Sequence, residues 1–92
     1  MAMKKIILFL ALFGFSLNTL ADEVTHQLGN SGYAIREAMQ AGAPRKSPAS
    51  YFKALNLQNQ AKKAFSNENL EMAIQVSKEA EAEAKLALKK SL

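Results

Sequence analysis

Residues 70–88 read LEMAIQVSKEAEAEAKLAL, which is the most clearly periodic segment of the 92-residue chain. Small and apolar side chains recur there every three or four positions, the spacing of one face of an α-helix. These positions are Leu70, Ala73, Ile74, Ser77, Ala80, Ala84, Ala87 and Leu88. Lys89 and Lys90 follow at the end where the helix dipole favours positive charge. The pattern predicts a helix over residues 70–90 whose buried face is mostly alanine.

The preceding segment predicts a second helix over residues 48–65. Its apolar stripe consists of Tyr51, Ala54, Leu55, Gln58, Ala61 and Phe65. Ser47 followed by Pro48 is a helix-start signal, because a serine hydroxyl can cap the helix and proline has no N–H to leave unpaired. The polar break at residues 66–69 has a usual length for joining antiparallel helices, and Asn69 is a suitable N-cap. We therefore expect these two helices to form an antiparallel hairpin.

A third helix is expected nearer the N-terminus, over residues 24–41. Its stripe consists of Val24, Leu28, Ser31, Ile35, Ala38 and Gly42. Gly29 and Gly32 each cost about 1 kcal/mol relative to alanine, so we expect this helix to be firm only from Tyr33 onward. Gly42 suits a left-handed C-terminal cap. No segment alternates apolar and polar residues as a strand does. The expected fold class is all-α: an antiparallel helical hairpin with a third, shorter N-terminal helix packed along it.

The first 21 residues have the three parts of a secretory signal peptide. Lys4 and Lys5 give a positive start, and an apolar run follows over residues 6–15. Small residues then lead to a predicted cleavage site between Ala21 and Asp22. The apolar run is shorter than the ~20 residues that a membrane-spanning helix needs, so we expect cleavage rather than retention.

Cleavage would leave a single helical domain over residues 22–92, exported to the periplasm, or secreted if the host lacks an outer membrane. Removal of Lys4 and Lys5 leaves ten basic against eight acidic residues, a net charge of +2. This balance does not favour binding to nucleic acid or to an anionic membrane. We expect the membrane to be contacted only through the signal peptide.

The chain contains no cysteine, although small exported domains often rely on disulfides. A domain of this size buries only ~60% of its unfolded surface, and alanine adds little apolar area. We therefore expect an envelope protein or a second copy of the chain to complete the burial.

The sequence offers no constellation for catalysis, for a cofactor or for a metal ion. The single histidine, His26, has no predicted orienting partner or pocket, both of which a general base needs. Structural metal sites need about four ligands. Glu79, Glu81 and Glu83 alternate along a helix and point in different directions, so we expect a solvated face rather than a carboxylate pair. The sequence predicts a non-enzymatic protein with no cofactor and no small-molecule substrate.

Phe52 and Leu86 are the candidate interaction residues. Phe52 lies about 100° around the helix from Tyr51, and Leu86 lies off the main stripe of its helix. Exposed aromatic side chains are favoured at interfaces, but Phe52 could equally pack against the first helix. Solubility is the expected role of the three basic pairs, which are Arg45-Lys46, Lys62-Lys63 and Lys89-Lys90.

Residues 34–38 read AIREA, residues 41–43 read AGA, and residues 69–73 read NLEMA. With Ser47-Pro48 and the alanine-spaced segment, they resemble a bacterial family catalogued as domain of unknown function 4398. The resemblance covers roughly residues 34–88. Glu68 stands where that family has the glycine of its turn, and Leu70 where it has a tyrosine. The resemblance implies export to the periplasm, in some members with a lipid anchor or a peptidoglycan-binding domain, and no catalytic residues.

Two functions follow as hypotheses. The first is a small periplasmic helical protein with a structural or protein-interaction role. The alternative is a membrane-associated peptide that is anchored by an uncleaved N-terminal helix or acts at the membrane surface, which lysines beside an apolar helix face would favour. The weakly hydrophobic alanine face places the alternative second.

Overall fold

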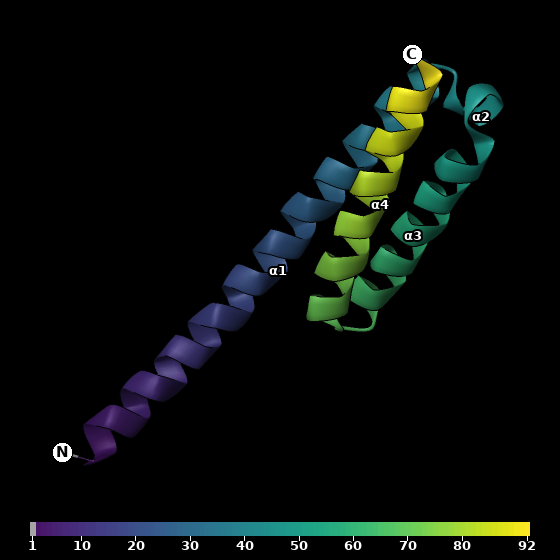
Figure 1. Ribbon diagram of the computed structural model, residues 1–92. Coiled ribbons are helices and arrows are strands. Elements are labelled where there is room, and N and C mark those ends of the chain that lie inside the picture. Colours follow the sequence, from purple (N-terminus) through teal and green to yellow (C-terminus); the bar gives the residue numbers. More distant parts are fainter. Residues whose placement is uncertain (1) are drawn as a thin grey trace.

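The computed structural model describes the backbone of residues 2–92 and the side chains of residues 19–92. This backbone forms four helices, which are α1 (Ala2–Gln40), α2 (Ala43–Lys46), α3 (Pro48–Ser66) and α4 (Leu70–Ser91) (Figure 1). Residues 2–92 contain no strand, which confirms the predicted all-α class. The side chains of the basic start and apolar run of the predicted signal peptide lie outside the described ones.

The helix α4 lies between α1 and α3 and packs along both of them (Figure 1). The chain reverses direction between α3 and α4 at the turn of residues 67–69, so these two helices run antiparallel, whereas α1 runs in the same direction as α4. Both α3 and α4 begin and end within one residue of the ranges that the periodicity predicts.

The helix α1 differs from the expectation at its start. It is continuous from Ala2 through Gly29 and Gly32, and it is the longest helix, with 39 residues. Val24, expected in a frayed turn, is completely buried. Tertiary packing of the α1 stripe thus outweighs the low helix propensity of the two glycines. In the part of the chain whose side chains the structure describes, no helix combines the length and apolarity needed to cross a membrane.

The expected break between α1 and α3 contains the short helix α2. Gly42 precedes it with a φ of 87°, the left-handed conformation predicted for this glycine. Ser47 precedes Pro48 as expected, but its hydroxyl does not cap α3. The Ser47 Oγ instead lies 3.0 Å from the Oγ of Ser91 at the end of α4. The predicted capping role of the Ser47 side chain is therefore wrong, because a distant buried partner takes the hydroxyl.

The turn between α3 and α4 contains Glu68, the only described non-glycine residue with a positive φ, at 62°. Asn69 then caps α4, since its Oδ1 accepts a hydrogen bond of 3.4 Å from the Met72 N–H. The predicted N-cap is confirmed.

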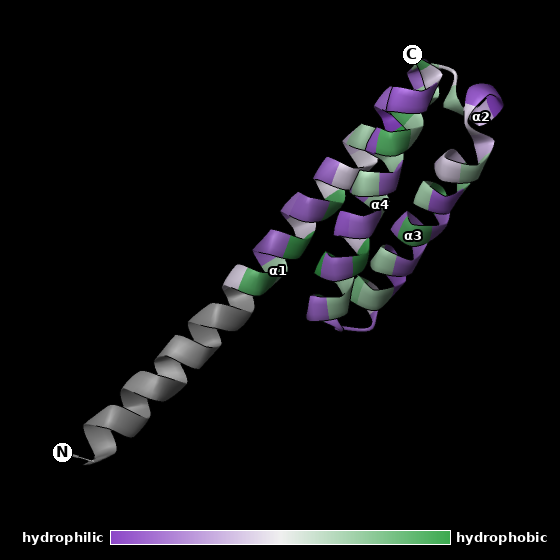
Figure 2. Ribbon diagram, viewed as in Figure 1, coloured by the Kyte–Doolittle hydropathy of each residue, from purple (hydrophilic) through white to green (hydrophobic). Residues whose placement is uncertain are grey.

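The core consists of two apolar clusters built mainly from alanine. The cluster beside α2 contains Ala34, Ile35, Ala38, Ala43, Tyr51, Ala54, Ala84 and Ala87. The cluster beside the α3–α4 turn contains Val24, Ala64 and Ala73, with Leu28, Phe65, Leu70 and Ile74 packed against it. Ten of the thirteen buried apolar residues among the described side chains are alanine. Hydrophilic positions interrupt the hydrophobic ones along α1, α3 and α4 (Figure 2), and some of these polar residues are buried.

Candidate functional site

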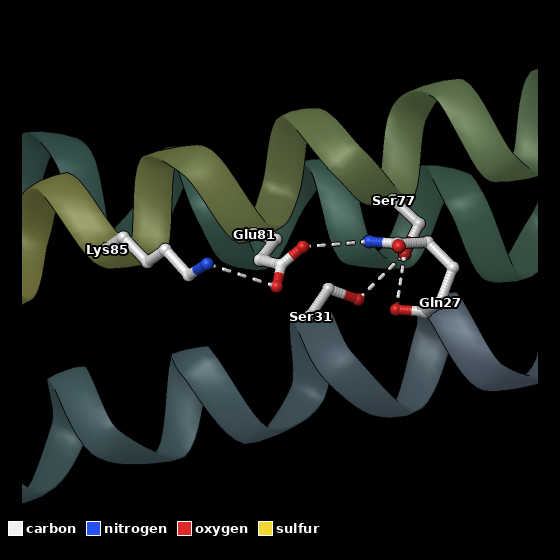
Figure 3. Close-up of polar contacts among 5 residues, drawn as sticks. All are labelled: Gln27, Ser31, Ser77, Glu81 and Lys85. Carbon is white, nitrogen blue, oxygen red and sulfur yellow. Dashed lines mark hydrogen bonds and ion pairs between the residues drawn. The ribbon is translucent and has the colours of Figure 1, made fainter.

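A buried polar layer separates the two apolar clusters, and each long helix contributes one residue to it. These residues are Ser31 of α1, Gln58 of α3 and Ser77 of α4. The Ser31 and Ser77 hydroxyl oxygens lie 2.8 Å apart, and the Ser77 hydroxyl also lies 3.0 Å from the Gln27 carbonyl oxygen, to which it can donate (Figure 3). Ser31 donates to Gln58 Oε1, and Gln58 Nε2 donates to the Leu28 carbonyl oxygen at 3.1 Å. Among the described side chains, no buried nitrogen or oxygen lacks a hydrogen-bond partner.

The polar layer continues to the surface through side chains of α1 and α4. Gln27 Nε2 donates to Glu81 Oε1 at 3.1 Å, and Glu81 Oε2 lies 3.4 Å from Lys85 Nζ (Figure 3). The second contact is the i,i+4 ion pair expected on a helix surface. The central members of the layer are neutral amides and hydroxyls, and none has a base aimed at it. Its contacts join the three helices, so we assign the layer to positioning them.

A signal for this layer is present in the sequence. Ser31, Gln58 and Ser77 each stand within an otherwise apolar stripe of their own helix. A buried polar residue needs a partner, so three of them at mid-stripe would indicate a shared network. The pairing itself depends on how the helices are aligned, which periodicity does not specify.

Of Glu79, Glu81 and Glu83, only Glu81 points toward α1, where it accepts a hydrogen bond from Gln27. Glu79 and Glu83 lie four residues apart and line one groove beside α3, so the prediction of three different directions is wrong for these two. Glu83 forms an ion pair of 3.1 Å with Lys53 of α3. Glu79 is exposed. The expectation of a solvated face is wrong for Glu81 and Glu83, because both are half-buried and paired with neighbouring helices.

His26 lies in a groove of about 450 Å³ between α1 and α4. The groove is lined by Thr19, Asp22, Glu23, His26, Gln27, Ile74 and Lys78. The described residues contain no group of three or more histidines and carboxylates arranged to hold a metal ion.

The predicted cleavage residues Ala21 and Asp22 both lie within α1. The carbonyl oxygen of Ala21 accepts a hydrogen bond of 3.1 Å from the Thr25 hydroxyl. Ala21 is half-buried beside Phe65 and Leu70, with which it lines a hollow next to the α3–α4 turn.

Phe52 and Leu86, the candidate interaction residues, are 55% and 40% exposed. The Phe52 ring meets the buried Tyr51 edge-on, with 5.3 Å between ring centroids and 81° between planes. The alternative in which Phe52 packs in the core is wrong, because Tyr51 takes the inward position. A groove of about 210 Å³ between α3 and α4 is lined by Lys53, Leu57, Glu79, Ala82 and Glu83. Leu86 follows Ala82 and Glu83 at helical spacing, so it lies on that side of α4.

Two of the three basic pairs do more than keep the surface charged. Lys46 Nζ donates to the Ser91 carbonyl oxygen at 3.3 Å, and Lys90 Nζ donates to Ser50 Oγ at 3.4 Å. These contacts tie the end of α4 to α2 and to the start of α3. Lys62 and Lys63 are exposed.

Comparisons of the chain with family models, with curated proteins and with solved structures find no match.

Proposed function

We propose that the protein is a small exported helical domain that binds another envelope protein, or a second copy of itself, through the outer surface of α3 and α4. The observation that carries this proposal is the position of Phe52 and Leu86. Both large apolar side chains are exposed, while the core is filled mainly with alanine. Aromatic residues at a surface favour protein contacts, and alanine burial alone stabilises a small domain weakly.

The arrangement of the core supports export with removal of residues 1–21. Val24 is the first buried residue after the proposed cut. Residues 22–92 therefore retain both apolar clusters and the whole polar layer. The cut would also place Asp22 and Glu23 in the first turn of the shortened α1, where the helix dipole favours negative charge. The resemblance to the family of unknown function 4398 implies export as well.

The binding proposal is tested by crosslinking in cells. A photoreactive amino acid replaces Phe52 in one variant and Lys62, an exposed position elsewhere on α3, in a matched control. We expect a discrete crosslinked species from position 52 and none from position 62. Sedimentation of purified residues 22–92 then shows whether the species is a dimer of this chain. A monomer that crosslinks equally at both positions, or at neither, would contradict the proposal.

The continuous helix α1 favours a second candidate, a membrane-associated form with its N-terminus retained. No break in α1 separates the predicted signal peptide from the bundle. In this form the bundle would be held at the membrane surface by residues 1–21. Cell fractionation with mass spectrometry distinguishes the two: a soluble species beginning at Asp22 supports the exported domain, and a full-length species confined to membranes supports the anchored form.

A further inference from the structure

The bond between Ala21 and Asp22 lies inside a regular helix in the folded chain. The Ala21 carbonyl also accepts the Thr25 hydroxyl at 3.1 Å, in addition to its place in the helix. Proteolysis acts on locally opened chain, so this bond must leave the helix before a peptidase can cut it.

Residues on both sides of the bond are also tied to the bundle. Val24, three residues after Ala21, is completely buried in the cluster that contains Ala64 and Ala73. Ala21 is half-buried beside Phe65 and Leu70. Extending the chain around the bond therefore requires the part of α1 from Ala21 to Val24 to separate from α3 and α4, because unwinding of the helix alone would leave these side chains packed.

We infer that docking of α1 protects the Ala21–Asp22 bond, so that cleavage must come before the bundle closes. This inference rests on the proposed export and adds an order of events to it. A chain that is cut first becomes the free domain. A chain that folds first keeps residues 1–21 and stays at the membrane, so the relative rates of cutting and folding set the proportion of the two forms.

The test uses the full-length chain in detergent micelles with purified signal peptidase. One sample is the folded chain, and the other is a chain kept unfolded by Ala54→Asp and Ala84→Asp, which place charges at two completely buried positions far from the bond. Circular dichroism checks both states. The product beginning at Asp22 is followed by mass spectrometry. We expect the folded chain to be cut at least about tenfold more slowly than the unfolded chain, because only its opened fraction is a substrate.

Two variants separate local docking from global stability. Val24→Ala weakens the contact next to the bond, and Ile35→Ala removes buried apolar atoms from the other cluster, at the far end of the bundle. We expect Val24→Ala to speed cleavage of the folded chain about tenfold, and Ile35→Ala to leave it nearly unchanged. All unfolded samples are expected to be cut at one rate, which shows that Val24 does not act through peptidase recognition.

Each remaining outcome has a distinct meaning. Equal cleavage of folded and unfolded chain would overturn the protective role of α1 and leave the proposed export intact. Equal acceleration by both variants would also overturn it, because the bond would then open only by global unfolding. Failure to cut either form at Ala21 would overturn the proposed export itself.

Discussion

Ser31 of α1 and Ser77 of α4 are completely buried and face each other across 2.8 Å between their hydroxyl oxygens. The contact lies in a bundle whose other buried positions are mostly alanine, which pack almost equally well in several alignments. A sliding of α1 by one turn along α4 would separate the two hydroxyls and take from the buried Ser77 its contacts with Ser31 and with the Gln27 carbonyl oxygen, at a cost of about 1–3 kcal/mol. The serine pair therefore specifies how the two helices align.

Removing one hydroxyl of this pair should destabilise the bundle. We expect Ser31→Ala to lower the free energy of unfolding by about 1–3 kcal/mol, because Ser77 and Gln58 lose a partner. Ser77→Ala should have a smaller additional effect in the Ser31→Ala background than alone. Urea unfolding of the four proteins of this double-mutant cycle measures the coupling. Strictly additive effects would show that the two serines do not act as a unit.

The glycines at positions 29 and 42 should respond to alanine in opposite directions. Gly29 is helical, and a Cβ there meets nothing within 4 Å. We expect Gly29→Ala to raise the free energy of unfolding by about 0.5–1 kcal/mol. Gly42 has a φ of 87°, so Gly42→Ala should lower it by about 1–2 kcal/mol. Thermal unfolding of both variants checks the pair, and a gain in stability at position 42 would refute the assigned backbone conformation.

The turn at Glu68 should be improved by glycine. The φ of 62° strains a side chain at this position, so we expect Glu68→Gly to stabilise the protein by about 0.5–1 kcal/mol. Asn67 has an ordinary φ of −88° and provides the control, since Asn67→Gly should give no gain. Equal responses at both positions, measured by urea unfolding, would argue against strain at Glu68.

Peroxide should oxidise both methionines of the bundle without unfolding it. Met39 and Met72 are 50% and 52% exposed, so their sulfur atoms can take up oxygen without placing a polar group in the core. We expect mass spectrometry to show one added oxygen at each and a change in unfolding free energy below about 0.5 kcal/mol. Ile35→Met supplies a buried methionine as the control, which should oxidise more slowly and lose stability when it does. Loss of helical circular dichroism in the oxidised natural sequence would contradict the prediction that the bundle stays folded when Met39 and Met72 are oxidised.

The sequence predicted those parts of the fold that local patterns determine. The ends of α3 and α4 follow from the apolar spacing, from Pro48 and from the cap at Asn69. The start of α1 was not predicted, because helix propensity at Gly29 and Gly32 says nothing of the packing that holds Val24. The left-handed Gly42 was predicted because its conformation depends on its own lack of a side chain.

The candidate site was predicted less completely, because its contacts join residues far apart in the chain. Leu86 is exposed as expected. For Phe52 the sequence left two alternatives open, exposure or packing against the first helix, and the structure shows the exposed one. The Ser47 hydroxyl was assigned to a local cap, yet its partner Ser91 is 44 residues away. The layer of Ser31, Gln58 and Ser77 was hidden for the same reason: each stripe shows one polar position, and only packing shows that the three meet.

The alanine residues that line the contacts between the helices have a consequence for how this protein can change by mutation. Serine differs from alanine by one oxygen atom, so an exchange between the two at these contacts would leave the distance between helices almost unaltered. The serine pair could therefore be moved to another position along the helices without rebuilding the core, by two exchanges that remove the present hydroxyls and two that introduce new ones. Bundles that share one backbone but carry their serines at different positions along the helices would be unable to exchange helices, because the hydroxyls of one would face the methyl groups of the other. In such a set, the positions of a few hydroxyl groups would determine which helices pair.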